Sequence, residues 1–518
     1  MNDSVTMPKQ TLLAEPQDDL EEEEEEEAKE KPPVSYLRLL GVTCVLGGVQ
    51  FGWALQLALL TPFVQDLGIP HEYASLIWLC GPIAGLVVQP TVGWYSDRCR
   101  SKYGRRRPYI VIGMFIVVLA MLLISNASDL GHLLGDPLSA QEKFSCSDGG
   151  PHNTQQPTPR PRAIFFFVLG FWILDVSNNL MQGPCRALVA DVAPKSQQYL
   201  GMAMITGWIG VGNMLGYAAG WVDWSSHLRF MQDDACNDNC ANLRTAFCLA
   251  IVSVSVCTLI TAKAANERPL TKPVGPAANP LKEVLLACRE LDTPMKWVCF
   301  VMFTNWIGLY CFFLYDTDFF GRQIYGGSPD SSDWRKVCDY NAGVRMGSLG
   351  LLLNSAVSLI ALVLPRLIPI LTSRGMWGMS LIVFAILMAS TPAVTTAPAG
   401  LIVFALLGVP WAVTLVVPFA LVSRLSGEKR AGLMMGVLNI FVVLPQLLVS
   451  AINPVFFSIS QVKKVGDSAS FVAGAACAVV GAAACIKIDK DRAEPTATED
   501  YVVMRKSTGG ATNDSTKV

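Results

Sequence analysis

The chain has 518 residues, of which 52% are hydrophobic and only 16% are charged, and its formal net charge is −2. Soluble domains carry about 25% charged residues, so the composition argues against an ordinary soluble protein. It also contains no concentrated basic module that would bind nucleic acid. The first 34 residues are polar and acidic, which is not the pattern of a secretory signal peptide.

Apolar stretches of membrane-spanning length recur along the chain. A helix needs about 20 apolar residues to cross roughly 30 Å of hydrocarbon. We expect twelve such helices, near residues 38–62, 74–95, 108–126, 163–186, 199–222, 244–264, 294–320, 343–365, 376–391, 397–423, 431–458 and 468–487.

Basic residues in the short loops predict the orientation. Six of them lie between Arg98 and Arg107, after the second span, whereas the loop after the first span has none. Because cytosolic loops carry the excess of Lys and Arg, both termini are expected in the cytosol. Lys463 and Lys464, in an expected outer loop, are a mild exception.

The spans divide six and six around residues 265–293, which contain four prolines. The motif that begins at Pro184 in the fourth span is echoed by the one at Pro418 in the tenth, although chance similarity between Gly-rich helices is an alternative. Two six-helix halves around a central site are typical of the major facilitator fold. We therefore expect an all-α membrane protein with a disordered N-terminus (1–34), two helical halves (35–264 and 294–487), a cytosolic middle loop (265–293) and a disordered C-terminal tail (488–518).

A polar stripe crosses the apolar fourth span. Asp175, Asn179, Gln182 and Arg186 have the spacing i, i+4, i+7, i+11, which places them on one helix face. A charge at membrane depth is costly, so such residues usually line a cavity or pair with one another. A permanent Asp175–Arg186 ion pair is the alternative, but the two residues are about 16 Å apart along a straight helix.

Asp175 is the candidate proton site. Water-free surroundings favour the neutral form of a carboxyl group, and a nearby cation favours the charged form. A carboxyl group that alternates between Arg186 and water would therefore bind and release a proton. All four histidines fall in expected outer loops, which leaves the carboxylate as the embedded proton carrier.

The loop after the second span contains the strongest local motif, Gly93-Trp-Tyr-Ser-Asp97-Arg98-Cys-Arg-Ser-Lys-Tyr-Gly104-Arg105-Arg106-Arg107-Pro108. It resembles the facilitator loop signature Gly-x-x-x-Asp-Arg-x-Gly-Arg-Arg, with four extra residues between Asp97 and Gly104. This expanded form resembles the plant sucrose–proton symporters, within the glycoside–pentoside–hexuronide cation symporter family. Asp97, Arg98, Gly104, Arg105 and Arg106 are candidates for a latch between the halves, and topology-setting charge is the other interpretation.

Other stretches between about residues 38 and 487 carry the same resemblance, including Gln50-Phe-Gly-Trp53, Leu174-Asp175-Val-Ser-Asn-Asn179 and Gly343-Val-Arg345. The resemblance implies a proton-coupled symporter for sucrose and related glucosides that works by alternating access, as a monomer and without cofactor or metal. We expect the plasma membrane, with the vacuolar membrane as the alternative, since the sequence carries no decisive sorting signal. A sugar sensor of the same fold, another glycoside and another coupling ion stay open.

The end of the seventh span holds a charged cluster. The resemblance makes Asp316 a candidate for proton coupling or gating, beside Asp175 and Arg186. Asp318 and Arg322 are four residues apart and are able to pair. With His71 and Arg345 they are candidates for an outer vestibule, with Arg345 either a partner of Asp316 or Asp318 or a snorkelling anchor. A merely solvated interfacial cluster is the alternative. The family commonly has Glu where this chain has Gln323, which reduces any charge network there.

Sugar recognition needs hydrogen-bonding side chains and often a flat apolar face. The candidates are Gln50, Trp53, Gln56, Asn178, Asn179, Gln182, Arg186 and Asn354, with Asn439 a further possibility. Each amide is equally consistent with an interhelical hydrogen bond. Cys146, Cys236, Cys240 and Cys338 fall in expected outer loops, where a disulfide is chemically possible but its pairing is open. We find no Walker loop and no nucleophile–base or metal set, so neither an ATP-driven pump nor an enzyme is expected.

Overall fold

The computed structural model describes residues 32–137, 159–231, 233, 235–236, 238–267, 280–329, 331, 333–361, 372–459 and 465–488. These residues are almost wholly helical, and the one β-bridge among them joins Asp233 and Cys236. The expected all-α architecture is therefore confirmed. The predicted tails, apart from residues 32–34 and 488, and Cys146 lie outside the described residues.

The N-terminal half consists of α2 (Tyr36–Thr43), α3 (Val45–Asp66), α4 (His71–Ile77), α5 (Cys80–Asp97), α6 (Arg107–Ser125), α7 (Ala127–Leu133), α8 (Pro161–Val192), α9 (Lys195–Trp221), α10 (Trp224–His227), η1 (Arg229–Met231) and α11 (Asp238–Ala265). After α12 (Pro280–Arg289), the C-terminal half consists of α13 (Thr293–Phe313), α14 (Asp316–Phe319), η2 (Phe320–Ile324), α15 (Trp334–Ala361), α17 (Ser373–Ser390), η3 (Thr391–Ala393), α18 (Ala397–Ser458) and α20 (Ser468–Cys485).

Eleven helical segments of the described chain are long and apolar enough to cross a membrane. The remaining expected span, residues 199–222, corresponds to α9, which has 27 residues but is not among these eleven. Two spans lie within α18, as Ala397–Val422 and Leu433–Ser458. Both were expected from the sequence, and the residues between them are helical in backbone.

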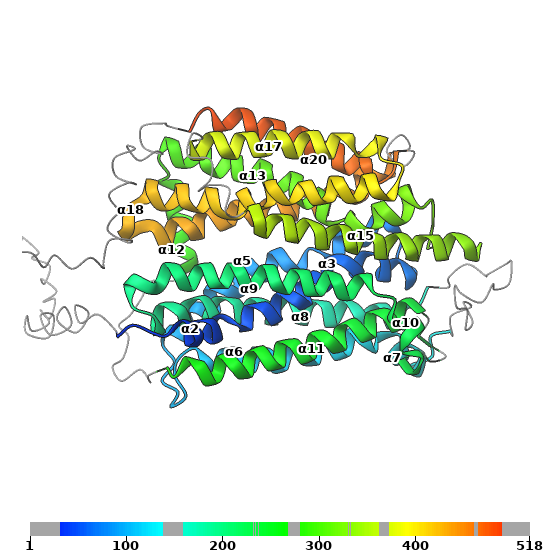
Figure 1. Cartoon of the computed structure of the whole chain (residues 1–518), viewed down its shortest axis with the longest axis horizontal. Coiled ribbons are helices and arrows are strands. Elements are labelled where there is room, and N and C mark those ends of the chain that lie inside the picture. The colour runs from blue at the N-terminus through cyan, green and yellow to red at the C-terminus, as the bar shows by residue number, and fades with distance from the viewer. Residues whose placement is uncertain are drawn as a thin grey trace, which may run out of the picture.

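The two halves form two layers of roughly parallel helices (Figure 1). In the first half α3 packs on α9 and α11, and α8 packs on α5 and α6. In the second, α13 packs on α18 and α20, and α15 packs on α18. The layers meet where α15 contacts α9 and where α18 contacts α4 and α5. Part of the expected middle loop is helical, because α12 packs against α18 and α5.

The halves are joined by hydrogen bonds at the end of the bundle that carries His71. Thr317 donates its hydroxyl proton to the carbonyl oxygen of Ala58 at 2.9 Å, and Ser75 donates to that of Ser450 at 3.2 Å. Asn239 donates to Asn341 at 2.8 Å. Among the described residues, every hydrogen bond between the two halves lies toward the end that carries His71. The two halves are therefore closed against each other there.

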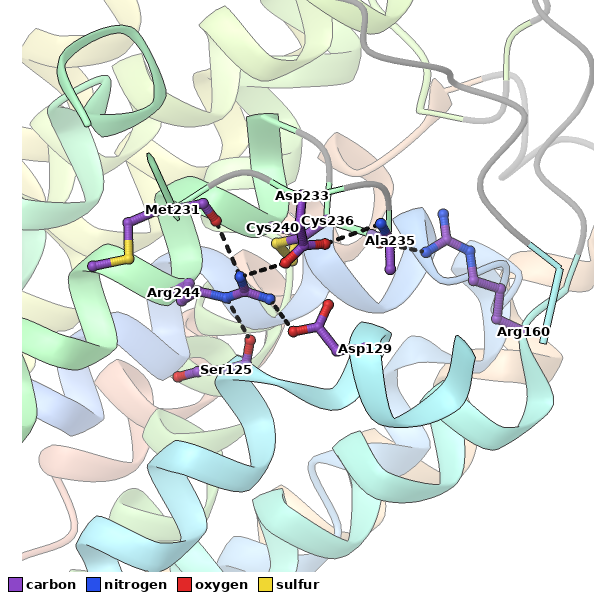
Figure 2. Close-up of a disulfide and its surroundings, with 9 residues drawn as sticks. All are labelled: Ser125, Asp129, Arg160, Met231, Asp233, Ala235, Cys236, Cys240 and Arg244. Atoms are coloured by element: carbon purple, nitrogen blue, oxygen red, sulfur yellow. Dashed lines mark hydrogen bonds and ion pairs between the residues drawn. A yellow bond between two sulfur atoms is a disulfide. The ribbon is translucent and has the colours of Figure 1, made fainter. Parts of the chain in front are cut away.

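A disulfide fastens the loop before α11 (Figure 2). Cys236 and Cys240 are bonded, as the sequence allowed, and Cys338 is also in a disulfide. Beside this pair, Arg244 forms ion pairs with Asp129 at 2.5 Å and Asp233 at 2.8 Å. One cation thus ties the end of α6 and α7 to the disulfide-bonded loop.

Candidate functional site

Asp175 is buried in the middle of α8, with 5% of its surface exposed. The thiol of Cys80 on α5 donates to Oδ2 at 2.9 Å, and the amide of Gln56 on α3 donates to Oδ1 at 3.4 Å. Neither donor carries a charge. The carboxyl group therefore lies among neutral hydrogen-bond donors from two neighbouring helices, one of which, Cys80, was not singled out by the sequence.

The other residues of the stripe on α8 differ in whether their side chains have a hydrogen-bond partner. The side chain of Asn179 donates to the carbonyl oxygen of Asp175 at 2.8 Å and accepts from Gln89 of α5 at 2.7 Å. Gln182 is half-buried and Arg186 is exposed. Within the described residues neither has a hydrogen-bond or ion-pair partner, so the direct Asp175–Arg186 pair is absent, as the helix spacing predicts.

The other amide candidates mostly hold helices together. Gln50 donates to Asn213 of α9 at 2.9 Å, and Asn354 of α15 donates to the carbonyl oxygen of Phe404 in α18 at 2.9 Å. Asn178 is buried, and neither atom of its amide has a hydrogen-bond partner among the described residues. Asn439 is half-buried on α18.

Aromatic rings line the contact between the halves. Trp53 of α3 meets Phe313 of α13 edge to face, with ring centroids 6.5 Å apart. Phe313 in turn packs on Trp411 at 5.2 Å, and Trp411 on Trp306 at 6.0 Å. The flat apolar face expected at Trp53 is thus part of a four-ring row, most of which the sequence did not indicate.

The predicted vestibule residues His71, Asp318 and Arg322 come together at the closed end. Asp318 is fully buried and accepts hydrogen bonds from Arg322 at 3.2 Å and from Tyr340. His71 Nδ1 lies 2.9 Å from Asp318, and its Nε2 lies 3.1 Å from Asp467, which the sequence did not single out. The alternative of a solvated cluster is wrong, because both aspartates are buried.

Asp316 and Arg345 do not join that cluster. Asp316 is 1% exposed and accepts a hydrogen bond from its neighbour, the backbone N–H of Thr317, at 2.7 Å. Arg345 lies 3.8 Å from Asp223 of the N-terminal half. The expected pairing of Arg345 with Asp316 or Asp318 is therefore wrong, since α15 directs this arginine toward the loop after α9.

Gln323, where the resemblance implies Glu, takes part in neutral hydrogen bonds. It donates to the carbonyl oxygen of Thr391 at 3.2 Å and accepts from Ser468 at 2.5 Å. These contacts join η2 to the starts of two neighbouring elements. The charge network at this end is therefore built without a Glu at this position.

The motif at Asp97 forms an ion cluster at the opposite end of the bundle. Arg105 and Arg106 both pair with Asp191 at the end of α8, and Arg106 also pairs with Asp97. Arg98 instead lies over the ring of Trp94, 4.1 Å from its centroid. The described pairs stay within the N-terminal half.

Glu267, after α11, completes this cluster. Its carboxylate accepts hydrogen bonds from the backbone N–H groups of Arg105, Arg106 and Arg107 at 2.9–3.2 Å, at the start of α6. Gly104 has φ +101°, and a Cβ there would lie 2.3 Å from Glu267. Only glycine therefore lets the turn approach this carboxylate, which sits at a favourable helix N-terminus. The sequence analysis did not single out Glu267; an acidic residue directly after the sixth span was the feature that could have indicated it.

Comparison with known proteins agrees with this architecture. The sequence profile of the Major Facilitator Superfamily matches residues 42–450. Sucrose transport protein SUC4 of Arabidopsis thaliana is 39% identical over 479 residues, covering 86% of this chain and 89% of the relative. The chain belongs to the major facilitator superfamily, in the family of the sucrose transport proteins. SUT3 of Oryza sativa subsp. indica is likewise 39% identical over 466 residues, covering 83% and 89%.

Solved structures of this superfamily share the fold. A D-xylose–proton symporter superposes with a TM-score of 0.59 at 16% identity, covering 88% of this chain and 99% of that one. A bacterial homologue of the lysosomal transporter Spinster, in an inward-facing conformation, gives 0.57 at 11% identity, covering 89% and 98%. The expected fold and family are thus confirmed, and the protein is a multi-pass membrane protein.

Proposed function

We propose that this protein carries sucrose together with protons across a membrane by alternating access. The names of its relatives support sucrose as the substrate, and the chain spans almost nine-tenths of the length of SUC4. The observation that supports proton coupling is the carboxyl group of Asp175, buried at mid-helix among neutral donors. With no cation beside it, the neutral acid is the favoured form.

In this proposal Asp175 takes its proton when the site faces the outside. The uncharged Asp175 no longer opposes closure of the halves. After the halves rock, Arg186, about three turns further along α8, helps release the proton by favouring the carboxylate. One charge moved through 100 mV supplies about 2.3 kcal/mol. At about 1.4 kcal/mol per tenfold, this sustains roughly a forty-fold sugar gradient.

Sucrose is proposed to bind between the stripe on α8 and the aromatic row. Gln182 and Arg186 have no other partner within the described residues and offer donors to sugar hydroxyls. The faces of Trp53 and its neighbours offer apolar area to the ring carbons. Gln56 links the two regions, because it lies on α3 with Trp53 and donates to Asp175. Asn179 and Gln50 are proposed to support the site through their interhelical bonds.

Orientation and location are part of the proposal. The basic cluster from Arg98 to Arg107 is placed in the cytosol, and the end that carries His71 and the Cys236–Cys240 disulfide faces outward. Disulfides persist in oxidising surroundings outside the cytosol, which supports this assignment. The plasma membrane is the proposed location, with the vacuolar membrane the alternative.

Uptake of labelled sucrose by proteoliposomes tests the proposal. With acid outside, we expect accumulation against a sucrose gradient that collapses when a protonophore is added. Replacement of sodium by potassium at fixed pH should change nothing, and excess competing glycosides would show the substrate range. Sucrose binding without pH-dependent uptake would instead identify a sensor and would refute symport.

A further inference from the structure

At the closed end, one imidazole ring joins the two halves of the protein. His71 begins α4 in the N-terminal half, whereas Asp318 on α14 and Asp467 before α20 belong to the C-terminal half. The two ring nitrogens lie 2.9 Å from Asp318 and 3.1 Å from Asp467, respectively. All three groups lie just beyond the candidate membrane spans.

This geometry favours a protonated ring. A neutral imidazole has one N–H donor and one acceptor, whereas the imidazolium has two donors. When both carboxyl groups are ionised, one on each nitrogen, only the charged form of the ring donates to both. The amide nitrogen of Gln65 also lies 3.3 Å from Nδ1, but the carboxylate of Asp318 is closer.

The charges around His71 balance only when it is protonated. Among the described residues, the ionisable groups that face it or its two partners are Asp316, Asp318, Asp467, Arg322, Tyr315 and Tyr340. Burial and the charge of Asp318 raise the pKa of Asp316, which favours its neutral form. Arg322 compensates one carboxylate, which leaves the other to the imidazolium. Removal of one partner from a buried charge pair is strongly destabilising, so loss of this proton opposes closure.

The two aspartates depend on His71 to different degrees. Asp318 also has Arg322 and Tyr340, while His71 is the ion-pair partner of Asp467 among the described residues. Burial raises the pKa of Asp318, but Arg322 and His71 outweigh burial and hold that pKa below its usual range. Burial and Asp318 raise the pKa of Asp467, so its charge relies on His71 and, to a smaller degree, on Arg322.

A divalent cation fits these side chains less well than a proton does. The ligand atoms of His71, Asp318 and Asp467 lie within 4.8 Å of one another. However, the guanidinium of Arg322 is 3.2 Å from Asp318 and would repel a second cation. The cluster is therefore better suited to a protonated ring than to a metal.

We infer that His71, by bridging Asp318 and Asp467 in its protonated form, is a proton-dependent bolt that holds the outer end of the transporter closed. Asp467 is the second carboxylate that the ring contacts. The inference rests on the alternating-access part of the proposed function, and it adds a second protonation, separate from Asp175, to the closing step. It is independent of which sugar the protein carries.

The pH dependence follows from the ring's surroundings. Burial lowers the pKa of His71, but the charges of Asp467 and Asp318 outweigh burial and raise it to about 9 in the closed state. In an open, hydrated vestibule the ordinary value is about 6.5. The stabilisation of the closed state is therefore complete below about pH 6.5 and is lost as the pH rises through about 9.

Distance measurements across the closed end test this inference without any sugar. Spin labels would be attached to unnatural residues in place of Tyr73 on α4 and Val465 before α20, both exposed. Cysteine labelling is unsuitable because the chain has 15 cysteines. A control pair, Tyr73 and Phe230, lies within one half and should keep a constant distance.

In the otherwise unmodified chain we expect a short Tyr73–Val465 distance at pH 6 that gives way to a longer one as the pH passes 9. Asp467→Asn should lower the closed-to-open ratio at pH 6 by about tenfold, and Asp467→Glu should restore part of it. His71→Gln should make the ratio independent of pH between 6 and 9.

An unchanged ratio and pH profile in both Asp467→Asn and His71→Gln would overturn the inference. If one variant loses the control distance, it is misfolded, and the other variant decides the question. If sucrose uptake fails while the distances respond as expected, the proposed substrate is wrong and the inference about His71 holds.

Discussion

The carboxylate of Asp175 on α8 lies 2.9 Å from the thiol of Cys80 on α5. This contact joins the proposed proton site to α5. The helix before α5 in the chain is α4, which begins with His71. A change in the position of α4 and α5 on opening would therefore also move a hydrogen-bond donor of Asp175. His71 and this hydrogen-bond donor of Asp175 therefore lie on two consecutive helices of the N-terminal half.

Replacement of Asp175 by Asn should abolish proton-driven accumulation of sucrose, because the amide keeps the shape of the side chain but binds no proton. Uptake into proteoliposomes with acid outside is the measurement. Cys80→Ala is the matched control: it removes one neutral donor and should leave accumulation intact with a shifted pH profile. Persistent pH-dependent accumulation in Asp175→Asn would remove this residue from the mechanism.

Arg186→Lys should weaken sucrose binding even though the charge is kept, because lysine lacks the planar fork of donors. Because Arg186 is exposed, we expect a loss of about 0.5–1.5 kcal/mol, the net size of one hydrogen bond, or roughly 2- to 12-fold in Kd. Binding calorimetry on the purified protein measures it. Arg98→Lys, which changes an arginine stacked on Trp94 away from the stripe, should bind sucrose normally.

Asp191→Asn should destabilise the N-terminal half, since Asp191 pairs with both Arg105 and Arg106. Because this cluster is partly exposed, we expect a loss of about 1–3 kcal/mol, less than for a fully buried pair. Asp97→Asn should cost under about 1 kcal/mol, because Asp97 is half exposed. Thermal unfolding in detergent ranks the two, and an equal Tm would contradict the assigned geometry.

Reduction of the Cys236–Cys240 disulfide should have a modest effect. The bond closes a loop of sequence separation 4, and the chain-entropy estimate for so short a loop is about 2 kcal/mol. Cys236→Ser should lower Tm by a few degrees and leave sucrose uptake unchanged. Arg244→Gln, which removes two ion pairs at the same loop, should lower Tm further. A larger loss from the disulfide than from Arg244 would show that this ranking is wrong.

The spans, the two halves and the polar stripe were predictable from sequence because they depend on local rules. Hydrophobic length reports membrane crossing, and helix periodicity alone puts Asn179 on the same face as Asp175. The i, i+4 pair of Asp318 and Arg322 was predictable for the same reason. The failure lies where an interaction crosses between helices: Arg345 pairs with Asp223, and not with Asp316 or Asp318.

The sequence by itself determined the class of this protein, its family and the helix face on which Asp175 lies, since each follows from composition, motif or period along one chain. Only the tertiary structure decided the partners. Cys80 and Gln56 reach Asp175, Glu267 reaches the start of α6, and Asp467 reaches His71, each across a long stretch of sequence. The physical reason is that helix packing, and not sequence distance, sets which buried polar groups must satisfy one another.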